Sequence, residues 1–551
     1  MNEIIYRLKK NPSLLTKIIV ASFFVNLLAL ATPIYVIQVL QRYVAYGVSS
    51  TLITLVVGIT FVSVFEFFFR NIRHRMTRET EASNTLLADR VMKKIVSIKS
   101  NYYSIQTNFR PDIVTKNIHT IQSTLNASTT LVLVDVPFVA IFLMALFLIH
   151  YQLGIIASIF IFFPFIILNF YKNKISKLSK NNTQLSLGTA RLHENSSSRF
   201  ETIKYFKLIN AVKKAWGNIV GSLINVKEDL EANKNVLSSF MSSITALLTI
   251  FIIAWGAVLA VDGQISVGAL IGANILGSRA LAPIIKFVQC IEPLNKSSDA
   301  LREINQFLSL PQDPEGGTEI KEFSGKIKIN DLYFQYPQSK VPVFEGLNCE
   351  VNPGELVVVT GSNGSGKSTL IKCIARLLEF NRGQIFLDSI EINQISIEWL
   401  RSNLTYLPQE PKFIDGTMLD NLLGLSEIKK DKMRDILQSV DLLDFVNTNP
   451  NGIKMILTNR GEDLPLGIRK RIALARSLVI NGQIVLLDEP TETIDIRGIQ
   501  AIHALISNMK KNNKTLIISS HDNDIIKKAD KIINLDIKPT PQLIVKNKKG
   551  T

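Results

Sequence analysis

Residues 361–369 read Gly361-Ser362-Asn363-Gly364-Ser365-Gly366-Lys367-Ser368-Thr369, a complete G-x-x-x-x-G-K-[ST] phosphate-binding loop. The loop lies between an apolar strand pattern at 355–360 and a helical pattern at 370–378. Its glycines allow successive backbone N–H groups to point into one anion-sized hollow, and the helix that follows adds its positive dipole end. The pattern therefore predicts a nucleotide site in which Lys367 contacts the β- and γ-phosphates of ATP and Ser368 holds Mg²⁺.

Two acids follow a second apolar strand pattern, at 484–487. A buried strand would deliver Asp488 beside Mg²⁺, and Glu489 could then orient or deprotonate the attacking water. Two acids at the end of a strand can also simply begin a turn. Because they follow the phosphate loop in the chain order that ATP hydrolysis requires, the sequence favours a catalytic pair.

Three further residues occur where the same chemistry can use them. Gln409 can reach Mg²⁺ or the water, His521 can contact the γ-phosphate after the strand pattern at 515–519, and Tyr336 offers a ring for adenine to stack on. Each alone would more often be a structural residue, but their order along the chain favours function for all three. The predicted catalytic residues are Glu489, His521 and Gln409, and the predicted metal ligands are Ser368, Gln409 and Asp488.

The runs at 469–476 and 488–495 complete a recognisable order of motifs. From about residue 326 onward the chain resembles the nucleotide-binding domain of an ABC transporter, an α/β P-loop NTPase. The resemblance implies ATP and Mg²⁺ as cofactors, Asp495 as the acid of the D-loop and Gly467 as part of the signature loop. The cofactor-binding residues expected on these grounds are Tyr336, Gly361, Ser362, Asn363, Gly364, Ser365, Gly366, Lys367, Ser368, Thr369, Gly467 and Asp495.

The rest of the chain has a membrane composition. Of the 551 residues 47% are hydrophobic, and the mean hydropathy of +0.21 is high for a soluble protein of this size. Six apolar runs are long enough to span a bilayer, at about 18–40, 52–69, 130–148, 153–170, 237–261 and 267–288. We therefore expect a six-helix all-α transmembrane domain at 1–305, a linker at 306–325 that contains clustered helix breakers, and the α/β ATPase domain at 326–551.

The net charge of +16 has a topological explanation. Much of the basic excess lies in the long segments 70–128 and 172–236, next to the apolar runs, which argues against nucleic-acid binding. The positive-inside rule places both segments, the N-terminus and the ATPase domain in the cytoplasm. Three cysteines and six histidines form no disulfide framework and no metal-ligand cluster.

Two ionisable residues in the apolar half are candidates for a polar pathway. These are Asp135, before Val136-Pro137, and Lys286, near the inner end of the sixth run. Charge that faces lipid is costly, so such residues either serve transport or pair with a partner, and the sequence leaves both open. By resemblance to ABC exporters, the segments 103–118 and 196–210 would contact the ATPase domains.

The membrane half adds a narrower resemblance. Residues 26–36, 49–52 and 135–142 resemble the permease part of type I secretion exporters. This implies a protein substrate, a dimer in the lipid of the bacterial inner membrane, a periplasmic adaptor protein and an outer-membrane channel. The first span begins near residue 18, so no N-terminal peptidase domain is expected. The alternatives are an exporter of lipids or peptides, or a nucleotide-gated regulatory protein with little hydrolysis.

One motif departs from the family. ABC ATPases work as dimers in which each ATP contacts the partner's signature loop, usually Leu-Ser-Gly-Gly-Gln, whereas residues 464–468 read Leu-Pro-Leu-Gly-Ile. Pro465 removes a hydroxyl and an N–H, and Leu466 adds bulk where backbone must approach the γ-phosphate. The chain is therefore expected to form either a homodimer with slow turnover or a heterodimer with a chain that carries an intact signature.

Overall fold

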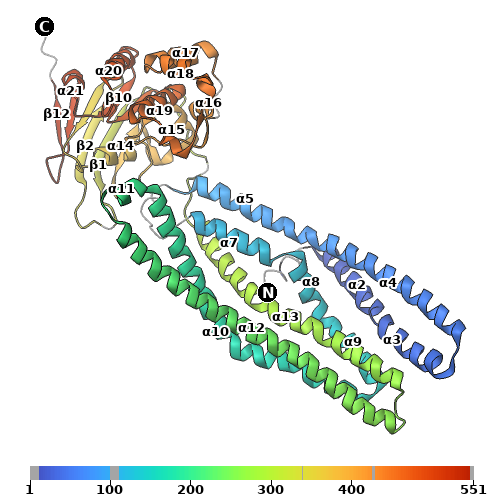
Figure 1. Ribbon diagram of the computed structural model, residues 1–551. Coiled ribbons are helices and arrows are strands. Elements are labelled where there is room, and N and C mark those ends of the chain that lie inside the picture. Colours follow the sequence, from blue (N-terminus) through green and yellow to red (C-terminus); the bar gives the residue numbers. More distant parts are fainter. Residues whose placement is uncertain are drawn as a thin grey trace. The chain divides into compact units, whose positions relative to one another are not determined.

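A computed structural model describes residues 6, 11–99, 111–314, 316–337, 339–424 and 428–546 (Figure 1). The chain divides into two compact units, one comprising Met1–Lys93 with Pro111–Ser309 and the other Lys94–Arg110 with Leu310–Thr551. Of the segment 103–118, residues 103–110 lie outside the described residues. The segment 196–210 comprises the end of α10 (Tyr151–Ser198), α11 (Phe200–Tyr205) and the start of α12 (Ile209–Val261).

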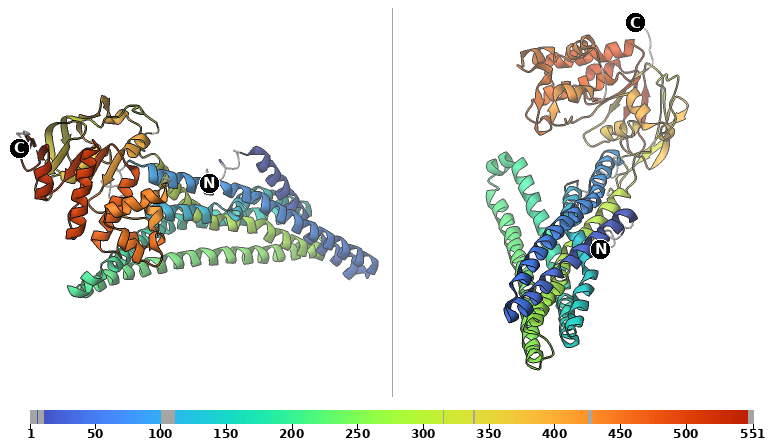
Figure 2. Two further views of the ribbon diagram at one scale, coloured as in Figure 1. Left: turned by 90° about the horizontal axis from the view of Figure 1, so that it is seen from above. Right: turned by 90° about the vertical axis from the view of Figure 1, so that its right-hand side faces the viewer.

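The first unit is built of helices, and α4, α10, α12 and α13 are the longest of those described (Figures 1 and 2). Besides α10, α11 and α12, they are α2 (Pro12–Leu28), α3 (Ala31–Gln38), a π-helix (Val39–Val44), α4 (Ser49–Arg78), α5 (Ala82–Ser97), α7 (Pro111–Thr124), α8 (Ala127–Asp135), α9 (Val139–Ile149) and α13 (Val267–Leu308), with 3₁₀ turns at Glu79–Glu81 and Val136–Phe138. Residues 94–99, at the end of α5 and just beyond it, group with the second unit.

Six helical segments are long and apolar enough to cross a membrane, and each contains one of the six runs expected from the sequence. They are Pro12–Val44, Ser49–Ser97, Ala127–Ile149, Tyr151–Ser198, Ile209–Val261 and Val267–Leu308. Large apolar side chains such as Phe61, Phe65 and Phe68 on α4 are more than half exposed. Such a surface is suited to lipid rather than water. The predicted fold class is confirmed.

The core of this unit forms where α10, α12 and α13 run beside one another. Met241, Leu248 and Ile252 of α12 are almost fully buried. Gly277 of α13 permits this close approach, because an added Cβ would lie 2.4 Å from a methyl carbon of Ile252. Small residues at helix crossings let backbones come together, which is the usual basis of packing between membrane helices.

Asp135 has a structural partner. Arg73 Nη1 donates to Asp135 Oδ1 at 2.6 Å and to the hydroxyl of Ser22 at 3.3 Å, and the Asn26 amide lies 3.5 Å from the same carboxylate oxygen. The side chain of Arg73 is 8% exposed and that of Asp135 is 23% exposed. The structure thus gives Asp135 the partner that the pairing alternative requires, and its role in a polar pathway stays a prediction. Lys286 is exposed, and within the described residues no ion pair joins it, so its pathway role stays a prediction.

Breaking this pair is expected to destabilise the chain. Arg73→Met alone leaves the Asp135 charge without its partner and should reduce the free energy of unfolding by about 3 kcal/mol. The double change Arg73→Met/Asp135→Leu should recover most of that loss, since both charges are gone. Denaturant unfolding in detergent micelles measures both.

The pair Glu66–Arg70, one turn apart on α4, provides the matched control, since the Arg70 side chain is 57% exposed. Arg70→Met should change the free energy of unfolding by no more than about 1 kcal/mol. A stable Arg73→Met protein that fails only in transport would instead support the polar pathway.

The second unit contains two main sheets. The antiparallel sheet has the order β2-β1-β4-β5 and the larger, mainly parallel sheet the order β12-β11-β3-β10-β9-β6. The strands are β1 (Ile327–Phe334), β2 (Phe344–Val351), β3 (Leu356–Thr360), β4 (Arg382–Leu387), β5 (Ile390–Glu391), β6 (Leu404–Leu407), β7 (Gly416–Thr417), β8 (Ile456–Leu457), β9 (Ile484–Asp488), β10 (Thr515–Ser519), β11 (Lys531–Asn534) and β12 (Gln542–Val545).

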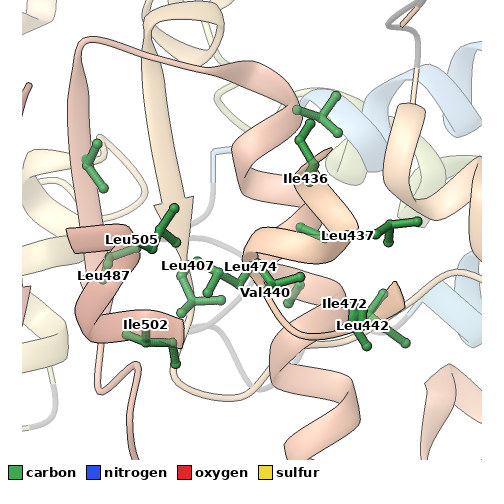
Figure 3. Close-up of a cluster of buried hydrophobic side chains, with 14 of the residues drawn as sticks. Leu407, Ile436, Leu437, Val440, Leu442, Ile472, Leu474, Leu487, Ile502 and Leu505 are labelled. Carbon is green, nitrogen blue, oxygen red and sulfur yellow. The ribbon is translucent and has the colours of Figure 1, made fainter. Parts of the chain in front are cut away.

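The second unit also contains eight α-helices within the described residues. They are α14 (Lys367–Ile374), α15 (Ile397–Asn403), α16 (Met418–Leu423), α17 (Lys430–Ser439), α18 (Leu443–Thr448), α19 (Leu466–Ile480), α20 (Ile496–Lys511) and α21 (Asn523–Lys528), with 3₁₀ turns at Ile392–Gln394, Gly452–Lys454 and Asn459–Gly461. Of these helices, α14, α15, α19 and α21 contact strands of the parallel sheet. One buried apolar cluster joins Leu407 of β6 and Leu487 of β9 to Leu437 of α17, Leu474 of α19 and Ile502 of α20 (Figure 3).

The strand register determines where the site forms. Strands β6, β9, β10 and β3 are parallel neighbours, with Leu407 paired to Leu487 and Ser519 paired to Asp488. The carboxyl ends of these strands therefore meet at one edge of the sheet, where open α/β sheets bind ligands. The phosphate loop follows β3 and His521 follows β10, so distant segments converge there.

Candidate active site

The phosphate loop begins directly after β3 and ends at the start of α14. Gly361, Gly364 and Gly366 have φ of 148°, 83° and 110°, a region that residues with a Cβ rarely adopt. A Cβ at Gly361 would lie 2.5 Å from the hydroxyl of Ser365, and one at Gly366 would lie 2.3 Å from a methyl carbon of Val343. Both sterics and dihedral angles therefore require glycine here.

Lys367 is held over this loop. Its side chain is 5% exposed, and Nζ donates to the carbonyl of Gly361 at 2.8 Å. The same atom lies 2.9 Å from Nε2 of His521 and 3.4 Å from Oε1 of Glu489. The structure thus brings together three residues predicted from separate segments, and it places the lysine ammonium at the loop where phosphates are expected.

Asp488 is fully buried at the end of β9. One carboxylate oxygen accepts from the Ser519 hydroxyl at 2.5 Å, and the other is buried with no hydrogen-bond partner among the described residues. Nearby, the hydroxyl of Ser368 lies 3.4 Å from Oε1 of Gln409. A hydroxyl, an amide oxygen and an orphaned carboxylate oxygen form a hard-oxygen donor set, so these residues fit Mg²⁺.

Glu489 occupies a constrained backbone position. Its φ is 49°, in the left-handed region. Its N–H donates to the carbonyl of Ser519 at 3.1 Å, and its side chain accepts from Nε2 of Gln409 at 2.7 Å. Non-glycine residues in this conformation cluster at functional sites. The turn aims the carboxylate at Gln409 and Lys367 instead of letting it continue along the strand direction.

The ionisation of Glu489 suits a base. Burial raises its pKa, but hydrogen bonds from Glu492 and Gln409, together with the Lys367 cation, outweigh this and hold the pKa below its ordinary value. The pKa of Glu492 is raised by its hydrogen bond to Glu489 and by burial. Of these two neighbouring carboxyls, Glu489 is therefore the one whose ionised form, which a general base needs, is favoured.

Sequence reasoning missed Lys470. This lysine is buried in α19, and Nζ donates to the carbonyl oxygens of Glu489 at 3.0 Å and Glu492 at 2.9 Å. The same atom lies 3.7 Å from a carboxylate oxygen of Glu492. Lys470 thus fixes the turn that carries the base. The sequence does offer one indication of this role, because Lys470 lies on the apolar side of a helix pattern.

Two residues after β11 were also missed. Asp536 accepts hydrogen bonds from the backbone N–H and the hydroxyl of Ser362, both at 2.7 Å. Lys538 donates to the carbonyl of Ser365 at 2.9 Å and to the carbonyl of Val343. These contacts stabilise the phosphate loop through residues near the end of the chain. No local sequence pattern predicts them.

Three predicted residues lie at the margin of the site. The Tyr336 hydroxyl lies 3.0 Å from the hydroxyl of Thr369, and 37% of Tyr336 is exposed beside α14. Asp495 caps α20 by accepting from the N–H of Gly498 at 3.1 Å, and it pairs with Arg471. Among the described residues no hydrogen bond joins Gly467 or Asp495 to the phosphate loop. Their roles stay predictions, as does adenine stacking on Tyr336.

The altered signature still forms a helix. α19 begins at Leu466 with Pro465 as its N-cap residue, and no side chain caps this end. Leu466 is 36% exposed. A Cβ at Gly467 would lie 3.4 Å from the carbonyl of Thr493, so the signature adjoins the 493–495 run. The helix therefore retains backbone N–H donors and a positive dipole end without the usual serine and glutamine side chains.

Comparison with known proteins agrees with this geometry. The family model described as ABC transporter matches residues 344–492, and the model described as ABC transporter transmembrane region matches residues 15–277. The alpha-hemolysin translocation ATP-binding protein HlyB of Escherichia coli O157:H7 is 25% identical over 96% of this chain and 75% of its own length. The leukotoxin translocation ATP-binding protein LktB of Bibersteinia trehalosi is 24% identical over 94% of this chain and 73% of its own length.

The fold has a solved counterpart. The structure of a bacterial Atm1-family ABC exporter with ATP bound matches with a TM-score of 0.83 at 19% identity, over 96% of this chain and 94% of that one. Together the two family models account for most of the chain, one for each half. The chain belongs to the ABC transporter family, with a transmembrane domain followed by an ATP-binding domain.

Proposed function

We propose that this chain is an exporter subunit that uses ATP hydrolysis to move a protein substrate across the bacterial inner membrane, as in type I secretion. The ATPase part of the proposal rests mainly on one observation. The side chains of Gln409 and Lys367 both contact the carboxylate of Glu489. The protein substrate is supported by relatives that are named for toxin translocation and that align with nearly the whole chain.

The residues divide the chemistry among them. The backbone of the phosphate loop and Lys367 bind the phosphates, and His521 adds a contact on the γ-phosphate side. Glu489 accepts the proton of the attacking water, and Gln409 orients Glu489. Ser368, Gln409 and Asp488 would hold Mg²⁺, which when bound neutralises charge on the phosphates.

The altered signature supports a second proposal, that the working unit is a heterodimer. In such a dimer the phosphate loop and Glu489 of this chain face an intact signature on a partner chain. The other composite site then contains residues 464–468 and turns over slowly, because each lost charge-assisted hydrogen bond is worth about 1.5–3 kcal/mol. A homodimer would have two such slow sites.

The remaining partners follow from the export proposal. A periplasmic adaptor protein and an outer-membrane channel would extend the conduit. The charge distribution supports a cytoplasmic N-terminus and ATPase domain, with the spans in membrane lipid. No feature of the described residues suggests a nucleic-acid partner.

A lipid or peptide exporter is the second candidate. The match to the Atm1-family exporter is equally compatible with it, because one fold covers nearly all of both chains and does not by itself select a protein cargo. A nucleotide-gated regulatory protein is the third candidate, and only the altered signature supports it.

A cargo test separates these candidates. The purified chain in nanodiscs is titrated with the C-terminal segment of a candidate secreted protein from the same genome. Specific binding that also raises ATP hydrolysis is the expected result. Stimulation by lipids or short peptides, with none by such segments, would contradict the protein cargo. Nucleotide binding without any transport would point to the regulatory protein.

Lys470 provides a prediction specific to this chain. Lys470→Met leaves the carbonyls of Glu489 and Glu492 without a donor, and the turn that aims the base should shift. Because small displacements of a catalytic group are costly, kcat for ATP should fall about 10- to 100-fold with little change in KM. Lys470→Gln restores a donor and should recover most of the rate. Equal losses in both variants would contradict a positioning role.

A further inference from the structure

A cavity of about 330 Å³ lies between α10, α12 and α13 of the first unit. These three helices run next to one another (Figure 1). The volume is within the range of small-ligand sites, about 300–1,000 Å³. None of its lining residues takes part in the nucleotide site, so the ATPase chemistry does not explain it.

One part of the cavity is apolar and lies at the membrane boundary. Leu168, Leu237 and Val288 line it, one from each helix. Each of these residues lies within two residues of the end of a predicted membrane span. The positive-inside rule assigns these ends to the cytoplasmic face. The cavity therefore lies where the hydrocarbon meets the lipid headgroups.

The polar part of the cavity carries excess positive charge. The charged residues that line it are Lys172, Lys180, Lys234, Lys296, Glu292 and Asp299.

Both acids already have partners. Lys180 Nζ lies 3.2 Å from a carboxylate oxygen of Asp299, and Lys296 Nζ lies 2.8 Å from one of Glu292. The buried hydroxyl of Ser179 also donates to Glu292 at 2.9 Å. The acids of the cavity are thus engaged by two of its lysines and a serine.

The other two lysines are not balanced by cavity residues. Lys234 Nζ lies 3.6 Å from Glu231, which is outside the cavity. Within the described residues no ion pair joins Lys172, which is exposed. A third polar feature comes from Pro293 inside α13, since proline has no N–H to donate to the carbonyl of Gln289. Lys172, Lys234 and Gln289, whose carbonyl lacks this helical donor, therefore line the cavity beside its apolar residues.

We propose that this cavity binds an anionic phospholipid of the cytoplasmic leaflet. Its phosphate lies between Lys172 and Lys234, a headgroup hydroxyl donates to the Gln289 carbonyl, and its acyl chains follow Leu168 and Leu237. Basic pockets between membrane helices at the cytoplasmic side are suited to anionic headgroups. The cavity shares no residue with the nucleotide site, and lipid binding there goes beyond the export function.

The test measures lipid binding without ATP or cargo. The full chain in mild detergent is mixed with equal amounts of phosphatidylglycerol and phosphatidylcholine, and native mass spectrometry counts the bound lipids. The wild type should retain phosphatidylglycerol preferentially. Lys172→Gln/Lys234→Gln should lower its affinity for phosphatidylglycerol about 30-fold, since each lysine contributes a cationic contact.

The matched control is Lys174→Gln/Lys227→Gln, which removes two exposed lysines of α10 and α12 that do not line the cavity. It should bind phosphatidylglycerol like the wild type, and thermal unfolding checks that both variants are folded. Equal binding by the two double variants would overturn the proposal. Complete displacement of the lipid by inorganic phosphate would overturn it in favour of a simple anion site, and displacement by an acidic cargo segment in favour of a cargo subsite.

Discussion

Glu489→Gln is expected to lower ATP hydrolysis by about 100- to 10,000-fold, the usual contribution of a general base. Glutamine preserves the shape of the side chain but cannot accept a proton from water. The phosphate loop and Lys367 are unchanged, so ATP should still bind. Radiolabelled ATP, followed for hours on the chain in nanodiscs, measures both turnover and retention.

The control for this prediction is Glu410→Gln. Glu410 is exposed and lies next to Gln409 in the chain, so its change alters net charge equally without touching the base. It should hydrolyse ATP at the wild-type rate. If Glu489→Gln retained most of the activity, the proton would go elsewhere and the assignment of the base would be wrong.

Lys367→Met is expected to weaken ATP binding about 10- to 150-fold, corresponding to one charge-assisted hydrogen bond of about 1.5–3 kcal/mol. Hydrolysis should fall by a further 100- to 1,000-fold or so, because the lysine also stabilises charge that develops in the transition state. The buried side chain contacts His521 and Glu489, so its loss separates both from the loop. Equilibrium binding of a fluorescent ATP analogue measures the loss of affinity, and single-turnover hydrolysis measures the loss of rate.

Lys372 provides the comparison, because it lies on the same helix, α14, and is half-buried. Lys372→Met should bind and hydrolyse ATP like the wild type. Unchanged ATP affinity in Lys367→Met would mean that backbone groups alone hold the phosphates.

The core of the site could be predicted from the sequence because its parts are local motifs on parallel strands. Once β3, β6, β9 and β10 are parallel neighbours, the residues that follow them must meet. The contact of Gln409 with Glu489, across 80 residues, is a consequence of that topology. Lys470 and Asp536 could not be found in this way, since their roles depend on how α19 and the end of the chain pack.

The membrane half shows a similar division. Hydropathy located the six spans but not the helix ends. α4 continues to Arg78 and α10 to Ser198, beyond the apolar runs, because packing and amphipathic faces sustain a helix outside the bilayer. The partner of Asp135 also could not be predicted from the sequence. Arg73 lies 62 residues away on another helix, and no periodicity links the two.

We propose that the altered signature at 464–468, not the catalytic residues, limits turnover by this chain alone. ATP hydrolysis by the purified wild type in nanodiscs, beside the repaired variant Pro465→Ser/Leu466→Gly/Ile468→Gln, tests it most directly. We expect turnover below about 1 s⁻¹ for the wild type and a rise of about 10-fold or more on repair. A wild-type homodimer that turns over at about 10 s⁻¹, with no gain on repair, would contradict it.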